Sequence, residues 1–133
     1  MEQRTIKNSV NCVGLGVHTG AEVSLKMRPA PSDTGIIFIR SDLKENNQIK
    51  ADFSLVSNTM LGTTLTNQSG VSIATIEHLM AALWGSKIDN VFIEVNGPEI
   101  PVMDGSSEPF MFMIESAGIE KLGKLRKYIE ITL

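Results

Sequence analysis

Glu77 and His78 stand side by side and form the most informative chemical pair in the sequence. A neutral imidazole can bind a metal ion, and an adjacent carboxylate can accept and deliver protons. The pair lies in residues 75–84, where apolar side chains recur at helical spacing, so the sequence predicts a helix there. A carboxylate in the first turn of a helix is also favoured by the helix dipole, so a purely structural interpretation stays open.

The predicted helix has an unusual second side. Its core-facing stripe consists of Ile76, Leu79, Met80 and Leu83. The opposite side carries Glu77, His78, Ala81 and Ala82. A face meant for water would normally carry Lys, Glu or Gln, so the two alanines leave room for another backbone or helix to approach closely. The alternative is that alanine is present only because it is a good helix former.

The second histidine, His18, lies in a glycine-rich segment at residues 14–20. The third glycine falls one position too late for a dinucleotide-binding fingerprint, and no lysine follows as in a P-loop, so we expect a tight turn between two strands. His18 is then either a turn residue bonded to backbone or a ligand or substrate contact. No complete zinc site can be read from the sequence, because His78 is not followed by a second histidine at position 82.

A proline-bracketed loop at residues 98–107 precedes a second predicted helix. Asp104 is followed by Gly105 and Ser106, a sequence typical of a turn and a helix cap. Asp104 could instead orient a catalytic group from behind, although its spacing does not require that role.

Hydrophobic patterning predicts the elements that position these residues. Alternation indicates strands at residues 23–28 and 89–95, a further strand is predicted at 36–40, and shorter extended segments are predicted at 5–12, 63–66 and 71–74. Thr75 would be the N-cap of the first helix and Gly85 its stop, whereas the second helix would run from the serines at 106–107 to a stop at Gly118. We expect an α+β fold, a two-layer sandwich in which a mostly antiparallel sheet carries helices on one face.

Composition limits the classes of protein that remain. The chain has 133 residues, and its 12 Lys and Arg against 15 Asp and Glu leave no basic excess, so nucleic acid is not an expected partner. The apolar runs are far shorter than the roughly 18 residues that span a bilayer, so no transmembrane segment is predicted. One cysteine and the absence of an apolar stretch at the start favour the cytoplasm.

The end of the sequence predicts one further strand. Residues 127–133 alternate after a basic stretch at 121–127, and the strand then reaches the last residue. It is either the edge strand of this domain or the beginning of a second one. We therefore divide the chain into a domain at residues 1–120 and, at 121–133, a linker with the first strand of a missing domain.

Six motifs occur in order along nearly the whole chain. They are GLGVHTG at residues 14–20, RPAP at 28–31, TGI at 34–36, TIEHL at 75–79, IDN at 88–90 and EIPVMDGS at 99–106. With these motifs the chain closely resembles the N-terminal half of the UDP-3-O-acyl-N-acetylglucosamine deacetylases. The resemblance implies a cytoplasmic zinc amidohydrolase of the lipid A pathway of Gram-negative bacteria, which removes acetate from a UDP-linked, acylated N-acetylglucosamine.

The resemblance also implies an architecture and roles for individual residues. The family has two related domains whose helical layers pack together with the active site between them, so the alanine-lined helix side would face a missing C-terminal domain. His78 matches a zinc ligand and Glu77 the catalytic carboxylate. The other two ligands and an acid histidine would lie beyond residue 133. We therefore expect the isolated chain to bind zinc weakly and to lack deacetylase activity.

Other positions are carried over as weaker expectations. The substrate would contact Met60, Leu61, Thr63 and His18. Asp104 would orient a catalytic group without touching the substrate itself. Gly62 stands where the family often carries a side chain such as Cys or His, so no contact from that position is assumed. We expect self-association through the uncovered helix side. The alternative is a free-standing interaction or regulatory module that shares only the fold.

Overall fold

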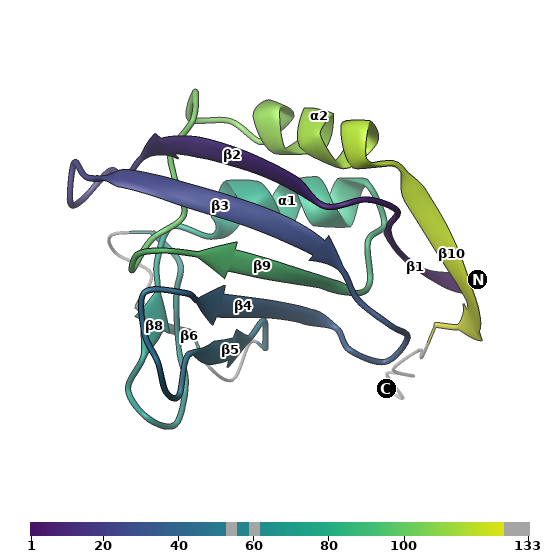
Figure 1. Cartoon of the computed structure of the whole chain (residues 1–133), viewed down its shortest axis with the longest axis horizontal. Coiled ribbons are helices and arrows are strands. Elements are labelled where there is room, and N and C mark those ends of the chain that lie inside the picture. The colour runs from purple at the N-terminus through teal and green to yellow at the C-terminus, as the bar shows by residue number, and fades with distance from the viewer. Residues whose placement is uncertain (53–55, 59–61, 127–133) are drawn as a thin grey trace, which may run out of the picture.

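A five-stranded sheet with helices against one face forms the framework of the computed structural model, which describes residues 1–52, 56–58 and 62–126 (Figure 1). The strands are β1 (Glu2–Ile6), β2 (Val10–Leu15), β3 (Glu22–Pro29), β4 (Ile36–Arg40), β5 (Gln48–Lys50), β6 (Val56–Asn58), β7 (Thr64–Thr66), β8 (Ser72–Ile73), β9 (Val91–Val95) and β10 (Ile119–Leu125). The helices are α1 (Glu77–Gly85) and α2 (Glu108–Ala117).

The central sheet has the order β2-β3-β9-β4-β5, and only the β4–β9 pair is parallel. Strand β3 shows why one face binds the helices, because Val23, Leu25 and Met27 are buried while Ser24 and Lys26 point outward and are exposed. Helix α1 lies behind this sheet, and α2 packs beside α1 next to β2 (Figure 1). The expected α+β class, with a mostly antiparallel sheet, is confirmed.

The core lies between the sheet and the two helices. Helix α1 contributes Leu79, Ala82 and Leu83, and α2 contributes Phe110, Met113, Ile114 and Ala117. Each large aliphatic or aromatic side chain that becomes fully buried contributes about 1.5–3 kcal/mol. The prediction that Ala82 lies on the open side of the helix was wrong, because Ala82 is completely buried while Ala81 is exposed.

The helix ends differ in part from the sequence-based expectations. The N-cap of α1 is Ile76 rather than Thr75, and no side chain caps the helix, whereas its last residue is Gly85 as predicted. Thr75 instead adopts a left-handed backbone with φ of 61°. Helix α2 follows the prediction more closely, since it carries a proline in its first turn and ends at Gly118.

The two ends of the described chain pair with each other in a separate two-stranded sheet of β1 and β10 (Figure 1). The extended segment expected at 5–12 is interrupted at residues 7–9, so it forms β1 and β2 instead of one strand. Residues 121–125, expected in a linker, belong to β10. The strand expected at 127–133 lies outside the described residues, and the domain boundary after residue 120 stays a prediction.

A buried polar network fixes this pairing to the main sheet. The Gln3 amide donates to Asp33 at 2.9 Å and to the carbonyl of Leu125 at 3.1 Å, and its oxygen accepts a hydrogen bond from Asn90 at 3.0 Å. Asn90 in turn accepts from the backbone of Gly35 at 2.9 Å. Because every buried amide in this chain of contacts is paired, the network adds specificity without an orphaned polar group.

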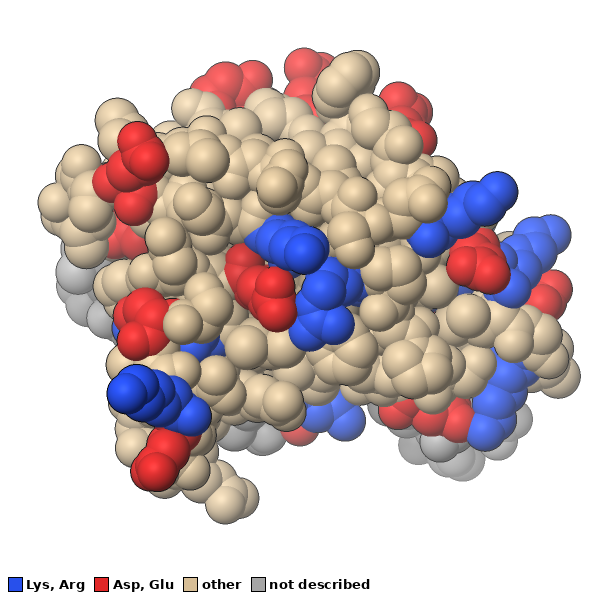
Figure 2. Space-filling view, in the orientation of Figure 1, with Lys and Arg blue, Asp and Glu red and all other residues tan. Residues whose placement is uncertain are grey.

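The outer face of the sheet is charged and mixed in sign, as the blue and red side chains in Figure 2 show. Arg28 on β3 pairs with Glu94 on β9 at 3.2 Å and stacks 4.9 Å from the ring centre of Phe92. Exposed pairs of this kind contribute about 1 kcal/mol or less. In the part of the chain that the structure describes, neither helix has the length and apolarity to cross a membrane.

Candidate functional site

Glu77 is the first residue of α1, and backbone contacts with Thr63 hold it in place. The Thr63 amide donates to the two carboxylate oxygens at 3.2 and 3.4 Å, while the amide of Ile76 lies 3.4 Å from the Thr63 carbonyl. The segment that enters β7 is therefore fastened to the beginning of α1. This places Thr63 beside Glu77.

Gly62 lies against the same carboxylate. A Cβ atom added at this position would lie 2.9 Å from Oε1 of Glu77, and the backbone φ is 98°. A side chain at position 62 would therefore require either the carboxylate or the loop to shift. Met60 and Leu61, the other expected substrate contacts in this segment, lie outside the described residues.

Thr75 makes a sharp bend that leads from β8 into α1. A β-branched residue with a positive φ is a conformational outlier that costs roughly 1–3 kcal/mol. The Thr75 hydroxyl is also buried and has no hydrogen-bond partner in the described part of the chain. No signal in the sequence indicated this strain. It lies two residues before Glu77, where the chain turns into α1.

His78 and Asp104 lie close enough for their charges to interact. Hydrogen bonds from the hydroxyl and amide of Ser106, at 2.7 and 2.9 Å, hold the pKa of Asp104 below its ordinary value, and positive charge on His78 lowers that pKa further. The expected turn at Asp104 is thus present, with Gly105 at φ of 81°. It brings an exposed carboxylate to the end of α1 that carries His78.

The glycine-rich segment forms the predicted turn, between β2 and β3. The backbone amides of His18 and Thr19 donate to the buried carboxylate of Glu99 at 3.0 and 3.2 Å. Sequence reasoning did not single out Glu99, because its partners lie about eighty residues earlier in the chain. The expectation that His18 contacts substrate stays a prediction.

A hollow of about 630 Å³ connects the turn to Asp104. Its walls come from the end of β2, the glycine-rich turn, the loop before α2 and the first turn of α2. The lining residues are Val13, Gly14, Leu15, Gly16, Val17, Val102, Met103, Asp104 and Pro109. The glycine-rich turn, the loop before α2 and the first turn of α2 therefore border one region.

The described residues contain no group of three or more His, Cys, Asp or Glu side chains that could hold a metal ion. His78 is therefore not part of such a group within the described residues. Since a catalytic zinc site uses three protein ligands, the remaining ligands would have to come from elsewhere.

The helix layer has an apolar surface that sequence reasoning missed in part. Trp84 on α1 is 85% exposed and Phe112 on α2 is 70% exposed. Met111 joins them, because its terminal methyl lies 3.9 Å from the position that a Cβ on Gly85 would take. We call Trp84, Met111 and Phe112 the helix-layer patch. Exposed aromatic side chains of this size typically mark a surface that another element covers.

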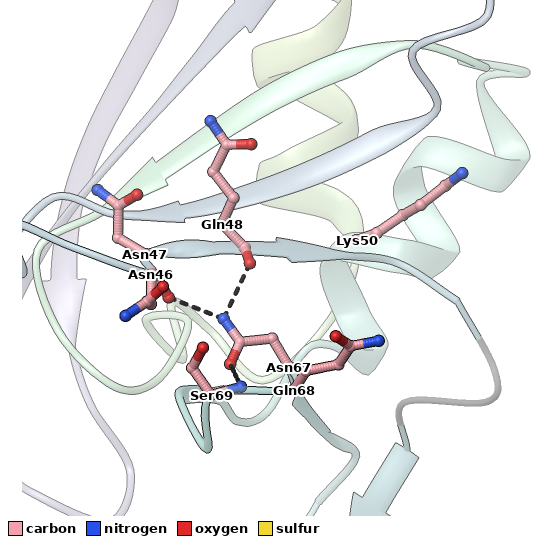
Figure 3. A pocket seen from close by; sticks show the side chains of 7 residues that line it. All are labelled: Asn46, Asn47, Gln48, Lys50, Asn67, Gln68 and Ser69. Atoms are coloured by element: carbon pink, nitrogen blue, oxygen red, sulfur yellow. Dashed lines mark hydrogen bonds between the residues drawn. The ribbon is translucent and has the colours of Figure 1, made fainter.

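A second hollow, of about 520 Å³, lies between β5 and the turn before β8 and is lined by amide side chains (Figure 3). Asn67 fastens the two walls, since its amide donates to the carbonyls of Asn46 at 2.8 Å and Gln48 at 3.0 Å. Its oxygen accepts from the amides of Ser69 and Val71, both at 3.0 Å. Asn67 therefore has a structural role, and the hollow contains none of the expected site residues.

The sequence is similar to known proteins over nearly its whole length. Residues 3–133 match the family described as UDP-3-O-acyl N-acetylglycosamine deacetylase. Three proteins named UDP-3-O-acyl-N-acetylglucosamine deacetylase are similar over 131 residues: those of Tolumonas auensis at 47% identity, Pseudoalteromonas atlantica at 49% and Aliivibrio fischeri at 50%. Each match covers 98% of this chain and 43% of the relative, so the chain spans less than half the length of these relatives.

Proposed function

Because the chain belongs to the UDP-3-O-acyl-N-acetylglucosamine deacetylase family, we propose that it is the N-terminal part of a zinc-dependent hydrolase of lipid A biosynthesis. The reaction would remove acetate from UDP-3-O-acyl-N-acetylglucosamine in the cytoplasm. One observation carries the proposal beyond family membership: Glu77 and His78 stand together at the beginning of α1, with the carboxylate held by the Thr63 amide.

The residues of this chain fit a zinc site only in part. His78 would be one ligand, and the donor set that a catalytic zinc requires would be completed by polypeptide outside this sequence. When bound, zinc would supply Lewis-acid polarisation of the acetamide carbonyl. The isolated chain would therefore bind zinc weakly and would not turn over substrate.

Glu77 would act as the general base. One carboxylate oxygen would accept a proton from the attacking water as the water oxygen bonds to the acetamide carbon. The carbon–nitrogen bond then breaks, acetate leaves, and an acid group from outside this sequence protonates the sugar amine. The hydrogen bond from Thr63 keeps the carboxylate in a fixed position, which such a proton transfer requires.

The remaining candidates would border the substrate. Thr63 and His18, together with Met60 and Leu61, would line the cleft, and Asp104 would support it from behind. The helix-layer patch would face the part of the protein that the chain does not include, because the relatives continue for more than half their length beyond the matched portion. An interaction module with the same fold would use the same patch for another protein.

Acetate release tests the proposed function. The complete product of the gene that carries this sequence is purified and assayed with UDP-3-O-acyl-N-acetylglucosamine, before and after zinc removal by a chelator. We expect activity that disappears on chelation, returns with zinc and falls below detection in His78→Ala. The matched control His18→Ala, which removes the other imidazole, should keep its bound zinc.

Three outcomes would contradict the proposal. A folded, zinc-loaded product that releases no acetate would refute the deacetylase function and favour the interaction module. Unchanged zinc content in His78→Ala would refute the assignment of that ligand. Turnover by the 133-residue chain alone would show that no further polypeptide is required.

A further inference from the structure

Glu99 is a buried carboxylate that the proposed chemistry does not use. It is only 2% exposed, and it accepts hydrogen bonds from the backbone amides of His18 and Thr19. Removing a carboxylate from water is costly unless hydrogen bonds compensate for the lost hydration. The arrangement therefore persists because the turn at residues 16–20 surrounds the carboxylate closely.

Gly16 makes that close approach possible. A Cβ atom at this position would lie 2.7 Å from both Cδ and Oε1 of Glu99, and also 2.7 Å from the hydroxyl oxygen of Thr19. The turn closes on itself through a 2.9 Å hydrogen bond from the amide of Gly20 to the carbonyl of Gly16. Glycine at position 16 is thus required by the contact with Glu99 and not by its backbone φ.

The backbone around Glu99 contacts the segment that leads into α1. Ala74 forms a bridge with Glu99, accepting from the amide of Ile100 at 3.0 Å and donating to the carbonyl of Pro98 at 2.9 Å. Ala74 is three residues before Glu77. Glu99 therefore binds the His18 turn with its side chain, while the backbone of its two neighbours, Pro98 and Ile100, binds the approach to α1.

Beyond Glu99 the same loop returns to β2 and the hollow. The amide of Val102 donates to the carbonyl of Leu15 at 2.9 Å, and the loop continues to Asp104. The space between β2 and this loop is tight, because a Cβ on Gly14 would lie 2.8 Å from Cβ of Pro101. A displacement of the turn would thus change the hollow beside Asp104.

We propose that Glu99 is a positioning residue, whose carboxylate fixes the 16–20 turn relative to the beginning of α1. The turn then holds His18 and the wall of the hollow at a set distance from His78. The ordering of the turn follows from the contacts of this chain alone. Its effect on catalysis rests on the proposed function.

Amide hydrogen exchange tests the ordering in this chain. In Glu99→Gln, the side-chain amide presents N–H donors to backbone donors, so we expect exchange of the His18 and Thr19 amides to accelerate at least about tenfold. Amides in the centre of the sheet, such as that of Leu25, should keep their rates, as should all of these amides in the surface control Glu94→Gln. Unchanged exchange at residues 18 and 19 would overturn the proposal.

Steady-state kinetics of the complete gene product test the positioning. We expect Glu99→Gln and Gly16→Ala to raise KM about tenfold while kcat changes less than about threefold, because both displace the same substrate-facing turn. The control Gly97→Ala places its Cβ 3.9 Å from Val23, an ordinary contact, and should change neither constant. A lower kcat with unchanged KM would indicate loss of folded protein and would overturn the positioning role.

Two further outcomes are separable. If Glu99→Gln does not fold, Glu99→Asp keeps both oxygens on a shorter side chain and should show the same rise in KM. If the wild-type product is inactive, the proposed function and the catalytic part of this inference both fail. The exchange rates of His18 and Thr19 would still decide whether Glu99 orders the turn.

Discussion

The carboxylate of Glu77 is positioned by a backbone amide and by the beginning of a helix. Glu77→Gln should therefore keep the shape of the site, because the amide oxygen can still accept from Thr63. It would remove the proposed proton acceptor, and general-base catalysis is typically worth about 10²–10⁴ in rate.

The expected result is a loss of at least about 100-fold in kcat of the complete gene product, measured as acetate release, with zinc content unchanged. Glu120→Gln, an exposed position on β10, is the matched control and should remain fully active. Retention of wild-type kcat by Glu77→Gln would show that another group accepts the proton.

Thr75 is strained, and its strain can be measured. Thr75→Gly removes the cost of a side chain at φ of 61° together with a buried hydroxyl that has no partner, so we expect the free energy of unfolding to rise by about 1 kcal/mol. Urea denaturation of this chain gives the value.

A glycine-to-alanine substitution at Gly70 measures the cost of placing a side chain on a backbone with positive φ. Gly70 has φ of 84° and no atom within 4 Å of an added Cβ, so Gly70→Ala isolates the backbone cost and should destabilise by about 1 kcal/mol. A loss of stability in Thr75→Gly would mean that the Thr75 side chain makes a stabilising contact.

At the residue scale, the sequence was informative where chemistry and spacing are local. Glu77 and His78 could be singled out because adjacency and helical period are visible in ten residues. Thr75 and Glu99 could not, since one depends on a backbone angle and the other on a carboxylate that meets a turn about eighty residues away. Long-range contacts of this kind leave no periodic pattern in a single sequence.

At the scale of elements, Arg40 joins the central sheet to a three-stranded sheet of order β6-β7-β8. Its guanidinium donates to the carbonyl of Ser72 on β8 at 2.9 Å and to both oxygens of Asp42, at 3.0 and 2.7 Å. The hydrogen bond from Arg40 holds the pKa of Asp42 below its ordinary value. The ionised carboxylate is therefore favoured by folding.

The stability that the Asp42 carboxylate contributes depends on pH. Because the folded-state pKa is depressed, the stabilisation is fully present above the unfolded pKa of about 3.9 and is lost as pH falls through the folded value. Asp42→Asn should reduce the free energy of unfolding by less than about 1 kcal/mol at pH 7, since the pair is partly exposed. The difference from wild type should narrow below about pH 4, as urea titrations at several pH values would show.

A difference that stays constant down to the acid limit would mean that Asp42 contributes through its shape and not its charge. The exposed carboxylate Glu45 provides the control: Glu45→Gln should leave stability unchanged at every pH.

The elements themselves were predicted to differing degrees. Strands β3 and β9 show clear alternation because one of their faces is buried against the helices, whereas β4 is a run of four apolar residues before Arg40. Strand β5 has three residues, too few to show a period, and β10 contains two lysines and Gly123, whose φ of 75° interrupts a regular strand. Its pairing with β1 joins the two ends of the described chain, which no local pattern predicts.

At the scale of the whole molecule, the helix layer is a side of the protein that exposes large apolar side chains. The outer face of the sheet carries paired charges, whereas the helix-layer patch presents Trp84, Met111 and Phe112 to solvent. Curated relatives have more than twice the length of the matched region, so in a longer protein further polypeptide is available to cover the patch. In this chain alone, a second copy is the simplest cover.

Phe112→Glu should therefore weaken self-association of the 133-residue chain. Phe112 and Leu125 are both 70% exposed, but Leu125 lies on β10, away from the patch, so Leu125→Glu adds the same charge at a different surface. Sedimentation velocity over a range of protein concentration should show a dimer for wild type and Leu125→Glu, and a monomer for Phe112→Glu, because a charge buried in an apolar contact is costly. Ala81→Glu, on the exposed side of α1, should act like Phe112→Glu. A dimer that persists in both helix variants, or a wild type that remains monomeric at high concentration, would show that the patch does not drive association.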